Sequence, residues 1–394
     1  MKTVLAVAYG GGHIACLLPV IEHLRGCGVR VQVLALTTAA DVCARRGVPF
    51  LGFKDFPALQ DERSRTHGAR LSALHPPHPA VTLDESIAYL GASYRDLEET
   101  FGITGASERF ERDGRQAFLP VASLRTIINE LAPDVVLATS APRAEWAAVI
   151  AARQAGIPTV VVVDLFGLSE KDRLRDPSYG DIICVISESV REGLVAEGRA
   201  ADSIRVTGNP VFDRLADPEL RERGLAFRRQ RGWDASCRVI TWASQPEPSD
   251  PQLPRRIEAA LLSALADHLD WYLVLRPHPS DVYTLPPSGP QVTHSTRADD
   301  LHTLLAASDV VVTMTSTVGL EAAFIGIPLV TWDLSENTRS CPYAKMGISE
   351  GVVSFSELAP AIMRALAGQG PRPRLPQVGS AARLVAETLQ EFLK

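Results

Sequence analysis

A glycine turn that ends in a histidine is the first feature of this sequence that can do chemistry. Gly10-Gly11-Gly12-His13 follows an apolar run at residues 3–9 and precedes residues 14–25, where Leu and Ile recur at helical spacing. Ligands of open α/β proteins bind at the carboxyl edge of the sheet, where an imidazole acts as a general base near neutral pH. We therefore predict that His13 is catalytic and that Gly12 belongs to a ligand-binding turn. The alternative is a histidine that only orients the first helix.

The same turn formally fits the G-x-G-x-x-A fingerprint of dinucleotide-binding enzymes, through Gly10, Gly12 and Ala15. That fingerprint requires an acidic residue about 20 positions later, at the end of the second strand, to hold the ribose hydroxyls. Residues 34–38 read Leu-Ala-Leu-Thr-Thr, and the next carboxylate is Asp41. The sequence therefore argues against a nicotinamide or flavin enzyme.

Two segments in the second half carry groups suited to phosphate and ribose. Arg276 and His278 stand in Leu-Arg-Pro-His-Pro at residues 275–279, a strand end stiffened by two prolines. Thr315-Ser316-Thr317 begins a helix, and its hydroxyls, free N–H groups and macrodipole form an anion site. Glu321 lies about one turn further on, where a carboxylate accepts hydrogen bonds from ribose hydroxyls. The alternatives are a stiff exposed turn and a carboxylate that merely favours the helix N-terminus.

Strand-like and helix-like segments alternate along the whole chain, which predicts two doubly wound α/β domains. Continuous apolar strands indicate a parallel sheet covered on both faces. We expect strands at residues 3–9, 29–36, 49–53, 134–138, 159–163, 181–186, 238–242, 271–275, 309–313 and 328–332, and helices at 14–25, 143–155, 188–197, 219–231, 255–268, 299–306 and 318–324. The expected domains are residues 1–208 and 209–380, followed by a C-terminal helix at 381–394 that packs back on the first domain. Residues 57–79, rich in Pro, His and Arg, predict a long loop or lid.

Composition and charge indicate which classes of binding partner and which cellular location to expect. Forty Lys and Arg against 46 Asp and Glu give a net charge of −6, which argues against a nucleic-acid partner. Six scattered cysteines favour free thiols in a reducing cytoplasm, and no apolar run approaches the ~20 residues of a membrane helix. We expect a cytoplasmic protein, with peripheral association at the inner face of the membrane left open. His67, His75 and His78 are irregularly spaced and predict solvated loop histidines instead of a metal site.

Several motifs together resemble the GT-B glycosyltransferase superfamily. They are the glycine loop that ends in His13, Val206-Thr207-Gly208-Asn209-Pro210-Val211, and the segment from Thr315 to Ala323 with Gly326-Ile327-Pro328. Within the superfamily the chain resembles the peptidoglycan N-acetylglucosaminyltransferase, capsule-type transferases and UDP-N-acetylglucosamine 2-epimerases, over residues 2–340. The resemblance implies two Rossmann-like domains that face each other across a cleft, the first for the acceptor and the second for the nucleotide sugar.

The resemblance also implies roles for individual residues. Glu321 would bind the ribose, Arg276, His278, Thr315, Ser316 and Thr317 the phosphates, and Ser244 and Gln245 would make a further phosphate contact. Asn209 at the junction is a donor-binding candidate by the same resemblance. Asp333 begins Asp-Leu-Ser-Glu-Asn, where the superfamily has a different donor-sugar motif. His13 would deprotonate the acceptor hydroxyl.

Three functions follow, in order of preference. The first is an inverting glycosyltransferase that uses a UDP-sugar, or else a CMP- or dTDP-sugar, in glycoconjugate, polysaccharide or natural-product biosynthesis. We expect it to need no metal or cofactor, since no Asp-x-Asp motif occurs in a suitable loop. The second is a nucleotide-sugar 2-epimerase, hydrolysing or not, with acid and base groups among Asp41, Asp164 and Glu188. The third is a non-catalytic nucleotide-sugar-binding protein. Product formed without an acceptor separates the first two.

Overall fold

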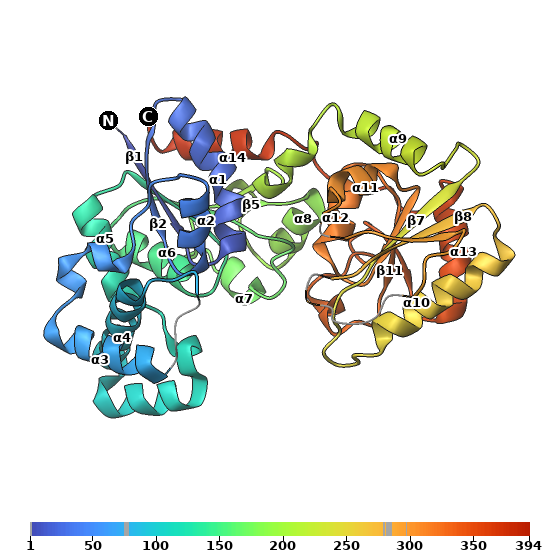
Figure 1. The fold of residues 1–394 in the computed structure, drawn as a ribbon. Coiled ribbons are helices and arrows are strands. Elements are labelled where there is room, and N and C mark those ends of the chain that lie inside the picture. The colour runs from blue at the N-terminus through green and yellow to red at the C-terminus, as the bar shows by residue number, and fades with distance from the viewer. Residues whose placement is uncertain (1, 75–78, 279, 281–285, 297) are drawn as a thin grey trace. The chain divides into compact units, whose positions relative to one another are not determined.

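The computed structural model describes residues 2–74, 79–278, 280, 286–296 and 298–394. Its internal contacts divide the chain into two compact units, hereafter unit 1 (Met1–Asp213 with Ser380–Lys394) and unit 2 (Arg214–Gly379). Each unit is built around a six-stranded sheet in which all strand pairs are parallel (Figure 1). The expected fold class, two doubly wound α/β domains of GT-B type, is confirmed.

The sheet of unit 1 has the strand order β2-β1-β3-β4-β5-β6. Its strands are β1 (Thr3–Ala8), β2 (Arg30–Ala35), β3 (Val135–Thr139), β4 (Thr159–Val162), β5 (Ile182–Val185) and β6 (Ile204–Val206). Successive side chains of β1 enter opposite cores: Val4 and Ala6 pack with helices α1 (Gly11–Gly26), α2 (Thr38–Arg45) and α14 (Ala381–Glu391), whereas Leu5 and Val7 face the other helices. The continuous apolar strands are therefore explained by helices on both faces.

The second face of this sheet is covered by α4 (Leu83–Asp113), α5 (Val121–Leu131) and α6 (Ala144–Gln154), with α3 (Glu62–Leu74) packed on α4. Shorter elements are η1 (Phe53–Asp55), η2 (Pro57–Leu59), η3 (Gly114–Ala117), α7 (Lys171–Leu174), α8 (Glu188–Ala196), η4 (Ala201–Ser203) and η5 (Pro210–Leu215). The predicted strand at 49–53 is wrong, because the segment makes only an isolated bridge from Leu51 to Leu34 before η1 begins.

The predicted loop or lid at residues 57–79 is also wrong, because most of it is helix α3. Two glycines let α3 and α4 touch: a Cβ at Gly68 would lie 2.0 Å from the Ile87 carbonyl oxygen, and one at Gly91 would lie 2.0 Å from that of Ser64. The polar composition that suggested a loop belongs to the exposed side of α3. His75 and His78 lie outside the described residues.

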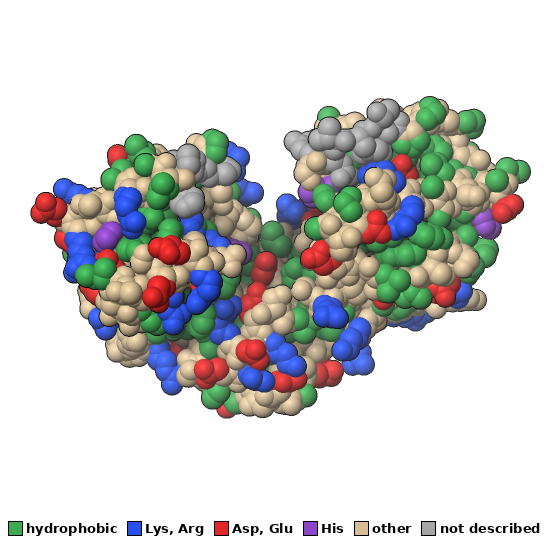
Figure 2. Space-filling view, turned by 90° about the horizontal axis from the view of Figure 1, so that it is seen from below, with side chains coloured by type: hydrophobic (Ala, Val, Ile, Leu, Met, Phe, Trp, Pro, Cys, Tyr) green, Lys and Arg blue, Asp and Glu red, His purple; other side chains and the backbone are tan. Residues whose placement is uncertain are grey.

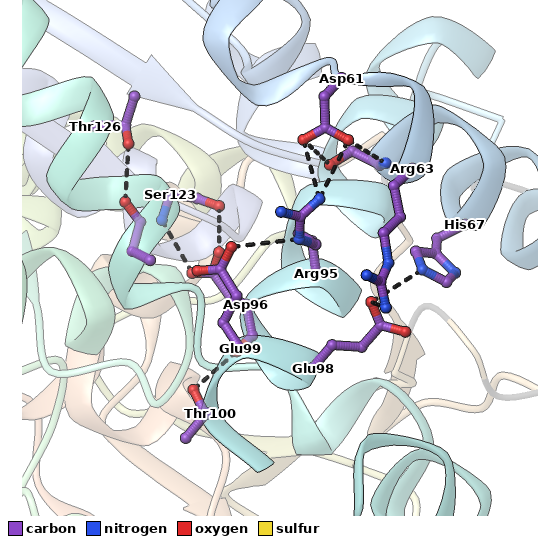
Figure 3. A network of polar contacts seen from close by, with 12 residues as sticks. Asp61, Arg63, His67, Arg95, Asp96, Glu98, Glu99, Thr100, Ser123 and Thr126 are labelled. Atoms are coloured by element: carbon purple, nitrogen blue, oxygen red, sulfur yellow. Dashed lines mark hydrogen bonds and ion pairs between the residues drawn. The ribbon is translucent and has the colours of Figure 1, made fainter. Parts of the chain in front are cut away.

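Polar contacts join α3, α4 and α5 (Figure 3). Nε2 of His67 lies 3.1 Å from Oε2 of the buried Glu98, so His67 contacts a carboxylate on α4 and is not a solvated loop residue. Asp96 of α4 accepts hydrogen bonds from the Ser123 amide and hydroxyl, at 3.0 and 2.8 Å, and so caps the start of α5. Burial raises the pKa of Asp96 to about 6. This carboxyl is therefore a structural group whose protonation changes near pH 6.

The sheet of unit 2 has the strand order β12-β11-β10-β7-β8-β9. The strands are β7 (Arg238–Ala243), β8 (Trp271–Arg276), β9 (Val292–His294), β10 (Val310–Thr313), β11 (Leu329–Trp332) and β12 (Glu350–Val352). The helices are α9 (Leu220–Gln230), α10 (Leu253–Ala264), α11 (Leu301–Ala307), α12 (Thr317–Phe324) and α13 (Phe355–Leu366), with short turns η6 (Leu265–Asp267) and η7 (Glu336–Arg339). Helices α10 and α13 cover one face, and α9 and α11 lie together on the other.

Positive and negative side chains are intermixed on the face of the molecule drawn in Figure 2. All six cysteines are free, and four of them are buried. Within the described residues, no helix is both long enough and apolar enough to span a bilayer.

Candidate functional site

Unit 1 carries a buried carboxylate that holds His13. His13 lies in the first turn of α1, and its Nδ1 is 3.1 Å from Oε1 of Glu145 in the first turn of α6. The same oxygen accepts the Tyr9 amide at 2.6 Å, while the buried Oε2 has no hydrogen-bond partner among the described residues. Both helices follow neighbouring strands, β1 and β3, so the strand order brings the two side chains together.

The charges around His13 favour its protonated form. Burial lowers the pKa of His13 and is the largest single influence, but the hydrogen bond and charge of Glu145, with the charges of Asp164 and Glu170, outweigh it and raise the pKa. Burial also raises the pKa of Glu170, the charge of Asp164 adding to this effect. A histidine and a carboxyl whose pKa values are both raised therefore share one end of the sheet, and such pairs occur at acid-base sites.

Of the three carboxylates predicted from sequence, only Asp164 belongs to this cluster. Asp41 pairs with Arg45 at 2.8 Å on α2, and Glu188 pairs with Arg191 at 2.6 Å on α8. Each of these two carboxylates is therefore held by its own helix, through an ordinary i,i+4 or i,i+3 pair.

Glu145 and Glu170, the two carboxylates that matter here, were missed in the sequence. Glu145 stands six positions after Thr139, the last residue of β3, so the rule that selected the groups after β1 and β10 would also have found it. Glu170 lies in the segment between β4 and α7, and no periodic pattern marks its position. Asn209, predicted to bind the donor, is buried in unit 1, where its amide nitrogen donates to the Asp164 carbonyl oxygen. Gly12 is exposed in the first turn of α1.

In unit 2, the predicted ribose ligand Glu321 is buried and already held by a histidine and an arginine. Its Oε2 is 2.7 Å from Nε2 of His302 on α11, and its Oε1 is 3.2 Å from the guanidinium of Arg214. Neither partner was predicted, because both lie in segments without a recognisable motif. Each carboxylate oxygen carries two lone pairs, so Glu321 retains the capacity to accept further hydrogen bonds.

The two residues of the predicted Arg-Pro-His-Pro turn differ in their surroundings. Arg276 ends β8, donates to the Ser295 hydroxyl at 2.7 Å and to the Thr296 carbonyl oxygen at 3.0 Å, and has its pKa lowered by burial. His278 is exposed and lies 2.7 Å from the Ser280 hydroxyl. Pro279 lies outside the described residues.

The start of α12 is tied to the end of β7 by a reciprocal pair of hydrogen bonds. Gln245 Nε2 donates to Thr315 Oγ1 at 2.9 Å, and the Thr315 amide donates to Gln245 Oε1 at 3.0 Å. Ser316 is the N-cap of α12 and accepts the Val318 amide at 3.3 Å, and Thr317 is the first helical residue. These predicted residues therefore meet at one edge of the sheet.

Ser244 and Asp333 lie at the ends of the strands on either side of β10. Ser244 Oγ accepts from the guanidinium of Arg255 on α10 at 3.2 Å, which brings an unpredicted cation to this edge. Asp333 accepts from the Thr331 hydroxyl at 2.8 Å, and burial raises its pKa. Within the described part of the chain, no group of three or more His, Cys, Asp or Glu side chains could hold a metal ion.

A sequence profile of the UDP-N-acetylglucosamine 2-epimerase family matches residues 106–340, more than half of the 394 residues. The chain belongs to this family. Solved UDP-GlcNAc 2-epimerases from Methanocaldococcus jannaschii and Neisseria meningitidis, the latter bound to UDP-GlcNAc, are each 14% identical to this family member, with TM-scores of 0.59 and 0.58. Each match covers 99% of this chain and 100% of the other.

The glycotransferase of kitacinnamycin is 17% identical, with a TM-score of 0.57 and coverage of 100% of this chain and 99% of that one. At such identities the likeness establishes the fold and not the activity. No curated protein sequence matches this epimerase-family chain. The resemblance to the GT-B superfamily and its 2-epimerase branch is confirmed. The preferred hypothesis, a glycosyltransferase, is not confirmed, and family membership favours the epimerase alternative.

Proposed function

We propose that this chain is a nucleotide-sugar 2-epimerase that acts on a UDP-linked N-acetyl sugar without a metal or cofactor. Family membership supports the substrate class. The observation that carries the reaction is the placement of His13 at the end of β1, with its Nδ1 3.1 Å from Oε1 of the buried Glu145. The raised pKa values of His13 and Glu170 support it. A CMP- or dTDP-sugar is the second choice of substrate.

Inversion at C2 needs one group to remove the C2 proton and another to return a proton on the opposite face. Since no carbonyl adjoins C2 to hold the released electron pair, that pair forms a C1=C2 double bond as the C1–O bond to UDP breaks, and UDP bonds to C1 again when the proton returns. His13, whose pKa is raised by the hydrogen bond and charge of Glu145, is the proposed acid. Glu170 is the proposed base, because a carboxylate with a raised pKa binds a proton more strongly. Glu145 and Asp164 favour the imidazolium through their charges and, in this proposal, do not exchange protons themselves.

Unit 2 is proposed to hold the nucleotide. Glu321 would accept hydrogen bonds from the ribose hydroxyls, and its orientation is fixed by His302 and Arg214. The start of α12, with Ser316 and Thr317, would bind the diphosphate. The further ligands proposed are Arg276, His278, Ser244, Gln245, Thr315 and Asp333 in unit 2, and Gly12 and Asn209 in unit 1.

A glycosyltransferase is the second candidate, and the contact between His13 and Glu145 is what favours it. A transferase needs one base to take the acceptor proton, and a histidine paired with a carboxylate supplies it. The two candidates differ in the need for an acceptor, since only the epimerase forms product from the nucleotide sugar alone.

The test is incubation of the protein with UDP-GlcNAc in D2O, without an acceptor, followed by proton NMR. An epimerase forms the C2 epimer and exchanges the C2 hydrogen for deuterium. Glu170→Gln and His13→Gln are each expected to slow this by about 10²- to 10⁴-fold, the usual contribution of an acid or base. Glu188→Gln, outside the cluster, is the matched control and is expected to keep the wild-type rate.

Failure to form the epimer or to exchange the hydrogen, together with sugar transfer once an acceptor is added, would reject the epimerase in favour of the transferase. Binding of UDP is tested separately by thermal unfolding, because a ligand at 100 times its dissociation constant adds about 2.7 kcal/mol to the native state. Glu321→Gln is expected to reduce this stabilisation. An unchanged shift would exclude Glu321 as a ribose ligand.

A further inference from the structure

Unit 1 contains a pocket of about 230 Å³ beyond the ends of β1 and β2. It is lined by none of the acid-base residues His13, Glu145, Asp164 and Glu170, but Gly10 on its wall lies close to His13. Tyr9, Gly10, Thr37 and Thr38 contribute to its wall from the strand ends, and Ser86 and Tyr89 contribute from α4. Its volume is below the range of about 300 to 1,000 Å³ for sites that hold drug-sized ligands, so it suits one small ring system. The proposed epimerisation uses a single substrate and gives this pocket no role.

The rings in the pocket are fixed before any ligand binds. The rings of Tyr9 and Tyr89 lie 5.5 Å apart, centroid to centroid. Tyr89 also packs edge-on against Phe53 at 5.3 Å and Phe118 at 6.4 Å, so its ring cannot swing away from the pocket. Aromatic faces held in this way stack on or meet the edge of another aromatic ring.

The hydroxyls of Thr37 and Thr38 together offer one donor and one acceptor. Thr37 donates its hydroxyl hydrogen to the Tyr9 carbonyl oxygen, so its oxygen is left to accept. Thr38 Oγ1 accepts the Gly11 amide at 2.9 Å, so its hydrogen is left to donate. A ligand hydroxyl, which both donates and accepts, complements this pair.

The backbone at this point is strained. Thr37 has φ 47°, which a β-branched residue rarely adopts and which costs about 1–3 kcal/mol. Strain of this kind persists where the surrounding structure imposes it, commonly at ligand sites. The strained residue, Thr37, and its neighbour, Thr38, both line the pocket.

The charges in the pocket favour a neutral ligand. It is lined by one carboxylate, Glu85, and one guanidinium, Arg115, whose formal charges cancel. The Glu85 oxygens already accept the amides of Phe53 and Lys54, at 3.0 and 3.1 Å. A buried sugar ring needs a hydrogen-bond partner for each of its several hydroxyls. The Ser and Thr hydroxyls on the wall are those of Thr37, Thr38 and Ser86, which suit a ligand with fewer hydroxyls.

We propose that this pocket binds a small, uncharged aromatic compound with a hydroxyl group, a phenol in chemical class. Such a ligand would sit beside His13, because Gly10 lines the pocket and a Cβ at Gly10 would be only 3.1 Å from Nδ1 of His13.

The test uses 7-hydroxycoumarin as the probe, with the full-length protein and no nucleotide present. Saturable binding is measured by calorimetry, and the histidine side-chain signals are followed by NMR, with His13 assigned from His13→Gln. Binding is expected to move the His13 signal and to leave that of His302 unchanged. Coumarin, which lacks the hydroxyl, is expected to bind about tenfold more weakly, the effect of losing about 1.4 kcal/mol of hydrogen bonding.

Two α4 variants form a matched pair. Ser86→Leu fills the pocket and is expected to abolish binding, whereas Ser107→Leu, on the same helix outside the lining residues, is expected to retain it. If Ser86→Leu fails to fold, Thr38→Val against Thr38→Ser removes and restores the donor instead. The proposal is overturned if 7-hydroxycoumarin does not bind, if coumarin binds equally, or if methyl glucoside binds more tightly. Because no nucleotide is involved, each of these outcomes is distinct from failure of the epimerase test.

Discussion

Replacing Glu145 by Gln is expected to lower the pKa of His13 while the fold stays intact. The glutamine carbonyl oxygen can keep both contacts of Oε1, from the Tyr9 amide at 2.6 Å and from His13 Nδ1 at 3.1 Å. The amide nitrogen replaces Oε2, which has no partner that the substitution would break. The change therefore removes a buried negative charge and little else.

The size of the effect follows from the contacts that remain. A hydrogen bond to a charged group contributes about 1.5–3 kcal/mol and a neutral one about 0.5–1.5 kcal/mol, so His13 loses about 1 kcal/mol of preference for the imidazolium. That is about fivefold in its proton-binding constant. Burial, the largest influence on His13, is then opposed by the charges of Asp164 and Glu170 and by the weaker hydrogen bond to the glutamine oxygen.

The assay is a histidine NMR titration of the wild type and Glu145→Gln, with Glu188→Gln as a charge-matched control on another helix. Unfolding free energies give a second measure. Since the folded pKa of His13 is raised, its pairing stabilises the wild type fully below the unfolded pKa of 6.5 and is lost as the pH rises through the folded pKa. The stability gap between wild type and Glu145→Gln should therefore be larger at about pH 5 than at about pH 9. A pKa of His13 in the variant equal to or above the wild-type value would refute the assignment of Glu145 as the group that holds the proton.

Three further predictions concern unit 1. Folding raises the pKa of Asp96 from 3.8 to about 6. The protonated carboxyl therefore stabilises the fold fully below pH 3.8, and up to about 3 kcal/mol of this stability is lost as the pH rises through 6. Asp96→Asn should flatten the pH dependence of the unfolding free energy in urea titrations, and an unchanged pH dependence would contradict the prediction. Arg199, buried, donates to the carbonyl oxygens of Asp176 at 2.7 Å and Tyr179 at 2.8 Å. Arg199→Ala leaves these oxygens without a donor and should cost about 1–3 kcal/mol for each one that stays buried, measured by chemical denaturation, and Arg199→Lys should cost less. Equal effects would show that the fork of donors is unimportant. Gly10→Ala places a Cβ 3.1 Å from His13 Nδ1 and should reduce kcat without altering UDP binding in thermal unfolding; full activity would mean that the position of the His13 ring does not matter.

Much of the fold could be predicted from local patterns. The apolar runs gave nearly every long strand of both sheets, because a strand buried on both faces is continuously apolar whatever surrounds it. The helix pair α3 and α4 was not predicted, since it depends on Gly68 and Gly91 meeting the backbone of the opposite helix, a contact that periodicity does not record. The predicted strand at 49–53 failed because Leu51 forms only a single bridge at the edge of the sheet.

The sequence by itself placed His13 and the segment from Thr315 to Glu321 at strand ends, because the turn that follows a strand is a local feature. Only the tertiary structure decided what these residues face. Glu145 is 132 positions from His13, and the two meet because β1 and β3 are neighbours in the sheet. Glu321 likewise contacts His302 of α11 and Arg214 of η5, two elements far from it in the sequence or separated from it by other strands and helices. Burial and these long-range charges set the protonation of the site, and both arise only when the chain is folded.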